Sequence, residues 1–107
     1  MRKPSDDKIK KRESRNRFGI LNAFVDIGLA KLPRSEFVVW VILFRDTKAD
    51  GTARASLDDL ARRGGMDRQT ASRAVGGLSR RKMFRVVKRG GLNRGPSVYQ
   101  IFPYPME

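Results

Sequence analysis

Gln69, Arg73, Gly76 and Arg80 are the residues of this chain whose types and spacing best suit a chemical task. They follow one another at intervals of four, three and four, so they share one face if the segment is helical. On such a face a glutamine can pair with an adenine edge and an arginine with a guanine edge, each through two hydrogen bonds. Gly76 lets a phosphate or sugar come close, or else Gly77 only relieves crowding or the helix frays early. The face is a candidate base-reading surface, and the competing interpretation is a solvated polar helix face.

Further donors surround this face. Arg68, Thr70 and Ser72 are short or flexible donors near the start of the same expected helix, where phosphate groups bind well, although Thr70 could instead serve local packing or bonding. A second basic group, made up of Lys88, Arg89 and Arg94, flanks a glycine-rich loop. These residues would contact a DNA backbone or enter a minor groove, or else they form a charged hairpin tip with no partner. The candidate base readers are Gln69, Arg73, Arg68 and Ser72, and the candidate backbone contacts are Thr70, Gly76, Arg80, Lys88, Arg89 and Arg94.

The residue inventory excludes most catalytic chemistry. The chain has no cysteine and no histidine, so disulfides, thiol nucleophiles, Cys/His zinc sites and imidazole-based mechanisms are ruled out. Asp58 and Asp59 are adjacent acids, but capping and the helix dipole explain them at a helix start. Gly90-Gly91 lacks the strand–loop–helix context of a nucleotide-binding fingerprint. We expect no enzyme activity, no cofactor and no metal, and the sequence identifies no small-molecule substrate.

Positive charge dominates the composition. The 107 residues carry 24 Lys and Arg against 11 Asp and Glu, a formal net charge of +13, while 39% are apolar. Such a chain has room for one small core and favours polyanionic partners, nucleic acid first and an anionic membrane second. Its longest apolar run, Phe37 to Phe44, has eight residues, far fewer than the ~18 of a membrane-spanning helix. We expect a soluble, cytoplasmic, nucleoid-associated protein with no membrane partner.

The first 17 residues form a basic arm by composition. They hold eight basic and three acidic side chains, and Ile9 is the only apolar residue after Met1. Because so little apolar surface cannot offset the entropy lost on ordering, we expect a disordered or weakly helical arm before a domain at 18–107. The arm either follows DNA phosphates or serves as a solvated tail that aids solubility.

Two helices are predicted next. Apolar residues at helical spacing run through 18–32, although glycines, Gly28 among them, weaken this prediction. Pro33 and Glu36 then favour the start of a second helix that ends near residue 47. Its β-branched and aromatic residues alone would also fit a buried strand, so the helix prediction depends on these two starting residues.

A pair of short helices joined by a glycine turn is predicted after a turn at 48–51 and a short strand at 52–55. Ser56 and Asp67 are the N-cap candidates of the two helices. Gly64-Gly65 ends the first one, with one glycine in the left-handed conformation that a tight turn needs. The second helix runs from Arg68 to about Arg81, and its buried face consists of Ala71, Ala74, Val75 and Leu78.

This helix pair resembles the helix-turn-helix of the winged helix-turn-helix superfamily. The residues that match the family pattern are Leu60, Ala61, Gly65, Met66, Arg68, Thr70, Ser72, Arg73, Val75 and Leu78. Phe84–Lys88 and Ser97–Phe102 fit two strands around a glycine-rich wing, so the resemblance covers about 18–102. It implies the α+β class, a helical bundle with a small antiparallel β-wing. A narrower likeness is to the N-terminal domains of plasmid and phage replication initiators.

The resemblance implies sequence-selective binding of double-stranded DNA, by a transcriptional regulator or by a replication-initiator-like module. The alternative is a winged-helix adaptor, replisome- or ribosome-associated, that binds protein or RNA without base readout. One residue departs from the family pattern, which usually places glycine just after the third helix. Here Lys82 stands in that neighbourhood, so it adopts a left-handed conformation or the helix ends in another way.

The apolar run also predicts a homodimer. One face of the expected helix carries Phe37, Trp40, Val41 and Phe44, and a second carries Val38, Val39 and Ile42. Either the segment Phe18–Leu29 covers the second face within one chain, or an exposed patch remains that is large enough to need a second copy.

Overall fold

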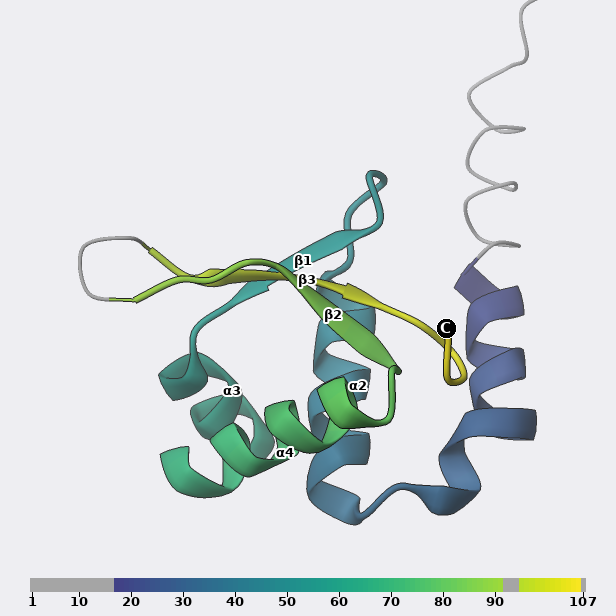
Figure 1. Cartoon of the computed structure of the whole chain (residues 1–107), viewed down its shortest axis with the longest axis horizontal. Coiled ribbons are helices and arrows are strands. Elements are labelled where there is room, and N and C mark those ends of the chain that lie inside the picture. Colours follow the sequence, from purple (N-terminus) through teal and green to yellow (C-terminus); the bar gives the residue numbers. More distant parts are fainter. Residues whose placement is uncertain (1–16, 92–94, 107) are drawn as a thin grey trace, which may run out of the picture.

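In the computed structural model, residues 17–91 and 95–106 are described, and they form a group of helices beneath a three-stranded sheet (Figure 1). This is the α+β arrangement that the sequence predicts. The prediction for residues 1–16 lies outside the described residues. Within the described ranges no helix is long and apolar enough to cross a membrane. The elements are η1 (Phe24–Gly28), η2 (Leu29–Lys31), α2 (Arg34–Asp46), β1 (Thr52–Ala55), α3 (Leu57–Gly64), α4 (Arg68–Arg80), β2 (Phe84–Lys88) and β3 (Ser97–Ile101).

The N-terminal segment is helical, as predicted, but irregular. Residues 17–23 are α-helical, and the π-helical turn η1 and the 3-10 turn η2 follow directly. Gly28 is buried at this irregular end. A Cβ atom on it would lie 2.4 Å from the carbonyl oxygen of Pro103 and 2.6 Å from Cε of Met83. The glycine that weakens the helix prediction is therefore needed where the C-terminal tail crosses the segment.

Arg17 fixes the start of this segment to the end of α2. Its Nη2 donates hydrogen bonds to the carbonyl oxygens of Phe44 and Arg45, at 3.2 and 3.1 Å, and its guanidinium carbon lies 5.2 Å from the centre of the Phe44 ring. A cation at this position complements the negative end of the α2 dipole. Arg17 therefore belongs to the folded domain, whereas composition alone places it in the arm.

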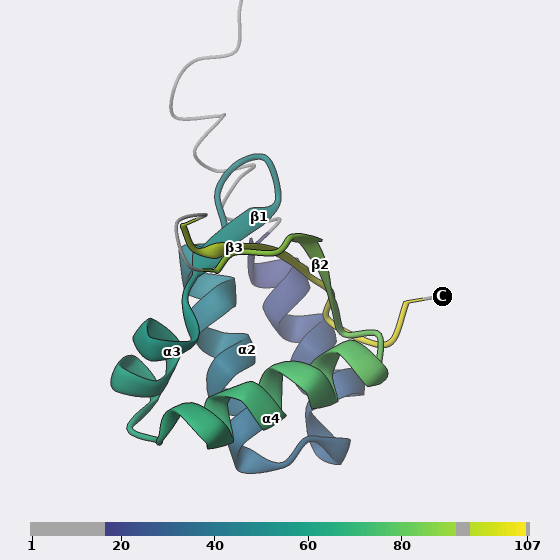
Figure 2. The same cartoon turned by 60° about the vertical axis from the view of Figure 1, so that its left-hand side comes forward.

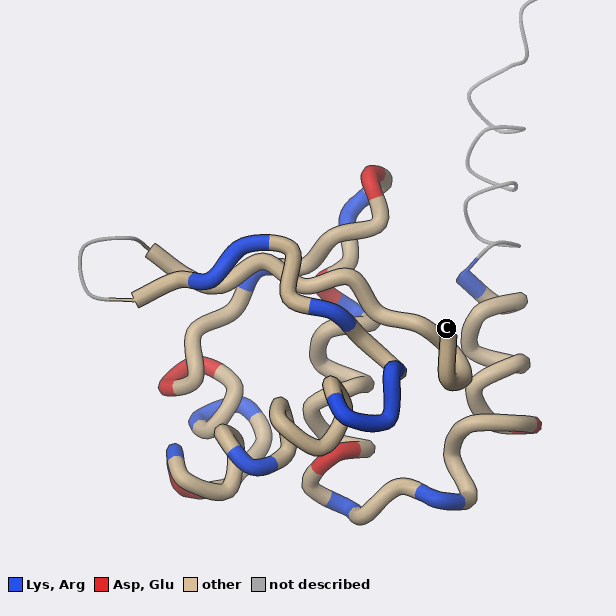
Figure 3. The backbone as a smooth tube through the Cα atoms, in the orientation of Figure 1, with Lys and Arg blue, Asp and Glu red and all other residues tan. Residues whose placement is uncertain are grey.

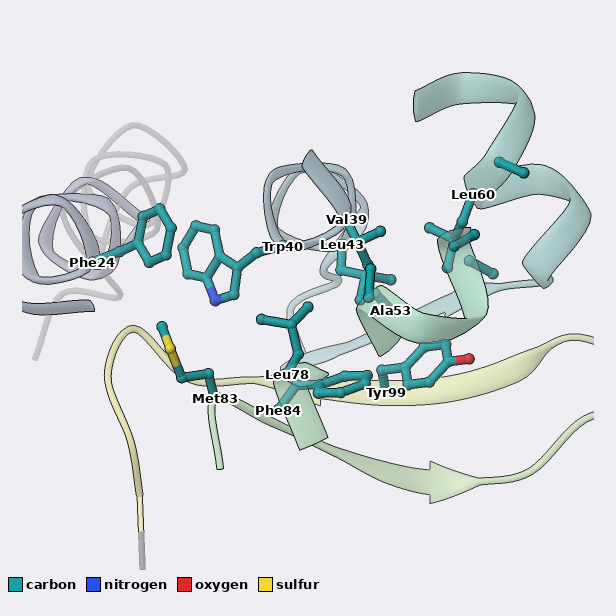
Figure 4. Close-up of a cluster of buried hydrophobic side chains, with 14 residues drawn as sticks. Phe24, Val39, Trp40, Leu43, Ala53, Leu60, Leu78, Met83, Phe84 and Tyr99 are labelled. Carbon is teal, nitrogen blue, oxygen red and sulfur yellow. The ribbon is translucent and has the colours of Figure 1, made fainter. Parts of the chain in front are cut away.

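Trp40, at the centre of α2, is the largest fully buried side chain. Its ring stacks on that of Phe24 with 3.6 Å between centroids, and its Nε1 donates a hydrogen bond to the carbonyl oxygen of Phe102 at 2.9 Å. Figure 4 shows the two rings face to face, between the N-terminal segment and α2. One indole thus joins the N-terminal segment, α2 and the C-terminal tail.

The two faces of α2 are covered by different elements. The N-terminal segment covers the aromatic face through Phe24, not the second face. The second face packs on α3, where a Cβ atom on Gly64 would lie 3.1 Å from Cγ1 of Val38 and 3.7 Å from Cδ1 of Ile42. The sequence leaves open whether the segment Phe18–Leu29 covers the second face; α3 covers it instead, because the Phe24 ring lies flat on Trp40 and because Gly64 lets α2 approach α3 closely.

The predicted helix caps are confirmed. Oγ of Ser56 accepts a hydrogen bond from the backbone N–H of Asp59 at 3.1 Å, and Oδ1 of Asp67 accepts one from the backbone N–H of Thr70 at 2.6 Å. Such bonds satisfy donors that the first helical turn leaves without partners. Gly65 follows α3 in the left-handed conformation, with φ of 65°.

Two groups of charged side chains fix α2 against α3 and α4. Arg63 donates to both carboxylate oxygens of Asp46 and to Asp59, and its hydrogen bond holds the pKa of Asp46 below its ordinary value. Glu36 is only 6% exposed, and its Oε1 accepts a hydrogen bond from Nε of Arg81 at 2.9 Å. The sequence assigns Glu36 to the helix dipole alone, and the structure adds this ion pair between α2 and the end of α4.

The sheet is antiparallel, with the order β1-β3-β2. Along the β2–β3 pair, Val86 lies opposite Tyr99 and Lys88 lies opposite Val98, so Val87 is an extra residue in β2. Such a β-bulge bends an edge strand and increases its twist. The bulge lies near the end of β2, just before Arg89.

Candidate nucleic-acid interface

Helix α4 has one buried and one exposed face, as its sequence predicts. Ala71, Ala74 and Leu78 are at most 1% exposed and face α2, α3 and the sheet. Gln69, Arg73 and Arg80 lie on the opposite side and are exposed. Figure 2 shows α4 running in front of α2 and below β2, so its outer side is open along its length.

A groove of about 420 Å³ separates α4 from the loop between β2 and β3. Ser72, Gly76 and Ser79 line it from the helix, and Arg89 and Gly90 line it from the other side. A Cβ atom on Gly76 would meet only Nη1 of Arg80, at 3.3 Å. Gly76 is therefore not required by internal packing, and it gives the groove a floor of bare backbone.

Gly77, the neighbour of Gly76, has a different role. It is buried, and a Cβ atom on it would lie 2.6 Å from Cδ of Glu36. The sequence leaves open whether Gly76 allows a ligand to approach or Gly77 only relieves crowding. The structure divides the pair, because Gly77 makes room for a buried carboxylate and Gly76 opens on a groove.

A second cleft, of about 560 Å³, continues along β2. It shares Ser79, Val86 and Arg89 with the first groove, and Lys82 and Arg85 add two more cations. Figure 3 shows Lys and Arg positions along α4, on β2 and toward the loop 89–96. The two clefts together form a basic channel between α4 and β2, which we call the α4–β2 channel.

The acidic residues near α4 are engaged by neighbours. Hydrogen bonding by Thr70 to the Asp67 cap lowers the pKa of that carboxyl. Asp59 pairs with Arg62 at 2.7 Å, and Asp58 lies 3.7 Å from Nε of Arg68. Within the described ranges, the cations between the start of α4 and residue 89 that form no ion pair are Arg73, Arg80, Lys82, Arg85, Lys88 and Arg89.

The other predicted site residues lie in distinct places. Arg68 and Ser72 are exposed near the start of α4. Thr70 is half-buried and its backbone N–H serves the Asp67 cap, which fits a local role for this residue. Lys88 and Arg89 lead into the loop 89–96, and Arg94 lies outside the described residues.

Sequence comparison finds no match, either among protein-family models or among curated proteins. Comparison of structures does find similar chains. One, described as "Mechanism for regulation of DNA binding of Bordetella bronchiseptica BpsR by 6-hydroxynicotinic acid", has a TM-score of 0.50 at 23% identity over 92% of this chain and 64% of that chain. Another, "The crystal structure of transcriptional regulator PA4135", has a TM-score of 0.47 at 14% identity over 92% and 66%.

The helix pair α3–α4 followed by the β2–β3 hairpin, and the likeness to the BpsR structure, decide the fold. The chain has the winged helix-turn-helix fold. In this winged helix α4 is the second helix of the helix-turn-helix, and the β2–β3 hairpin with its loop is the wing. The chain covers slightly less than two thirds of the BpsR structure, and the likeness is one of fold.

Three residues that extend the channel away from the wing are not among those predicted from the sequence. These are Ser79, Lys82 and Arg85, from the end of α4 and the start of β2. In the sequence, Lys82 stands out only because the winged helix-turn-helix family usually has glycine at this position. The two observations that could have identified it, a cation in a glycine position and a second cation three residues later, are both visible in the sequence.

Proposed function

We propose that this chain is a sequence-selective double-stranded DNA-binding protein that acts as a transcriptional regulator on the nucleoid. Helix α4 enters the major groove, where Gln69 and Arg73 read base edges, with Arg68 and Ser72 beside them. The single observation that carries the proposal is the α4–β2 channel, with its exposed cations and the bare backbone at Gly76.

The position of Gly76 supports a close backbone contact. A DNA strand lying between a helix in the major groove and a wing presents its sugars and phosphates to the space between them. Gly76 lines that space together with three serines, Ser72, Ser79 and Ser97, and with Arg89. A mid-helix glycine costs about 1 kcal/mol of stability relative to alanine, so an approaching strand gives a physical reason for retaining it.

The fold supports the same proposal. The BpsR structure is described in terms of the regulation of its DNA binding, and a shared winged helix makes DNA the first partner to test here. The formal net charge of +13 favours a phosphate backbone over a neutral partner. We assign no small-molecule effector and no cofactor to the chain.

We further propose that the chain forms a homodimer through the N-terminal segment and the neighbouring face of α2. Apolar side chains remain exposed there after folding: Phe18 at 63%, Val25 at 52%, Ile27 at 59%, and Phe37 and Val41 at 37% each. A second copy would cover them. A twofold dimer would place two α4 helices on successive turns of a near-palindromic site.

Selection from a random duplex pool, followed by competition at fixed salt, tests the proposed function. We expect one family of sequences to be enriched and to compete at least 10³-fold better than random duplex, the lower end of typical specificity ratios. If all duplexes competed equally, the binding would be electrostatic and independent of sequence, and the adaptor alternative would be favoured. The likeness to replication initiators stays a prediction from the sequence.

A further inference from the structure

The two helices of the helix-turn-helix end in the same backbone turn but with different residues at its critical position. In each turn the left-handed residue donates to the carbonyl oxygen three residues earlier, and the next residue donates to the one five residues earlier. That left-handed residue is Gly65 after α3, with φ of 65°, and Lys82 after α4, with φ of 59°. Among the described residues, Lys82 is the only non-glycine residue with positive φ.

Folding does not explain a lysine at this position. A Cβ atom in the left-handed conformation lies too close to the following carbonyl oxygen, whereas glycine adopts it without this cost. The Lys82 side chain is exposed and makes no hydrogen bond or ion pair with any described residue. The backbone carbonyl of Lys82 accepts from the N–H of Met106 at 2.9 Å, a bond that any residue would provide.

The position of Lys82 supplies the missing reason. Its side chain lines the second cleft of the α4–β2 channel together with Arg85 and Arg89. No acidic residue of the described ranges lines that cleft. Ser79, Val86 and Arg89 also line the groove beside Gly76, so the two spaces adjoin. A cationic channel of this kind fits a sugar–phosphate strand.

We propose that the DNA strand seated beside Gly76 continues past the end of α4, where Lys82 and Arg85 each bind a phosphate. The proposal rests on the proposed function and extends its site by two contacts. It also explains why a lysine occupies a glycine position: the ammonium binds DNA, at a cost in stability. Removing the side chain therefore moves stability and DNA affinity in opposite directions.

The variant Lys82→Gly tests this opposition, with Lys82→Arg as its matched control. Each phosphate contact contributes a slope of about −0.9 to log K against log[salt], so losing one lowers affinity about 8-fold at 0.1 M salt. We expect this loss for Lys82→Gly on selected and random duplexes alike, together with a Tm higher by about 4–8 °C. Lys82→Arg keeps both charge and strain, so its affinity, salt slope and Tm should stay close to those of the unmodified chain.

Arg85→Ala provides a second variant outside the strained turn. Among the described residues, the one hydrogen bond of its side chain runs from Nε to Oε1 of Gln100 at 2.9 Å and is exposed, so the fold should tolerate its loss. We expect the same reduction in salt slope, close to 0.9. Unchanged affinity and slope in Lys82→Gly and Arg85→Ala, with tight binding by the unmodified chain, would overturn the two contacts and leave the proposed function standing. Failure of the unmodified chain to bind any duplex would overturn both.

Discussion

Replacing Gly77 by alanine probes the tightest contact between α4 and the rest of the domain. The added Cβ atom would lie 2.6 Å from Cδ of Glu36 and within 2.8 Å of both of its carboxylate oxygens. The carboxylate can move away only by leaving its bond with Arg81, because it is almost fully buried between the helices. The substitution thus sets a gain in helix propensity against a lost ion pair.

The two effects can be weighed. Alanine in place of glycine inside a helix contributes about 1 kcal/mol, and a hydrogen bond to a charged group about 1.5–3 kcal/mol. We expect Gly77→Ala to lower the free energy of unfolding by about 0.5–2 kcal/mol. Gly76→Ala is the matched control one residue away. Its Cβ atom meets only the mobile end of Arg80, so it should raise the free energy of unfolding by about 1 kcal/mol.

Urea denaturation followed by circular dichroism measures both changes. The same measurement is made on Glu36→Ala alone and on Glu36→Ala combined with Gly77→Ala. Because Glu36→Ala removes the obstructing carboxylate, adding Gly77→Ala to it should raise the free energy of unfolding by about 1 kcal/mol. If Gly76→Ala and Gly77→Ala stabilise equally in the unmodified background, the carboxylate does not restrict this position and the reasoning fails.

Four further outcomes are expected. The affinity for duplex DNA should fall with salt at a slope near −5 if about six cations contact phosphates, and a flat titration would contradict DNA binding. Gln69→Ala and Arg73→Ala should each reduce the discrimination between selected and random duplex by roughly 1–3 kcal/mol, whereas Arg89→Ala should lower the affinity for all duplexes alike. If the two α4 substitutions lowered the affinity for selected and random duplex equally, this face of α4 would not read bases. Asp46→Asn should lower the free energy of unfolding by about 1.5 kcal/mol at neutral pH. Because Arg63 depresses the folded-state pKa of Asp46, that difference should be present above the ordinary pKa and disappear as the pH falls through the depressed value, as urea midpoints at several pH values will report. Sedimentation equilibrium should give the mass of two chains, and one chain both free and per bound duplex would exclude the dimer.

Local sequence signals account for most of the fold. Ser56, Gly65 and Asp67 mark helix boundaries through bonds between residues at most five positions apart, so they can be read without tertiary contacts. The apolar spacing of α4 likewise identifies its buried face. The left-handed conformation of Lys82 is predictable as one of two outcomes, since the helix has to end before a strand begins.

Contacts between distant segments explain what the sequence does not predict. Glu36 and Arg81 are 45 positions apart, and nothing local to either indicates the other. The close approach of Pro103 to Gly28 likewise joins opposite ends of the domain. The α4–β2 channel is of this kind, because its walls come from a helix and an edge strand whose separation depends on the whole core. A list of basic residues therefore identifies the partner class but not the path of the strand.

Two contacts between distant segments connect the proposed dimer surface to the proposed DNA interface. Phe24 stacks on Trp40, so the exposed N-terminal segment is fixed to α2. Glu36, on the first turn of α2, is fixed to Arg81 at the end of α4. A second copy bound to the N-terminal segment would thus hold its α4 helix through these two contacts and one intervening helix. Successive major grooves lie about 34 Å apart, and a rigid connection between the two α4 helices selects one spacing of half-sites. Loosening it with Glu36→Ala should leave each half-site's base preference unchanged and widen the range of spacings that the dimer accepts.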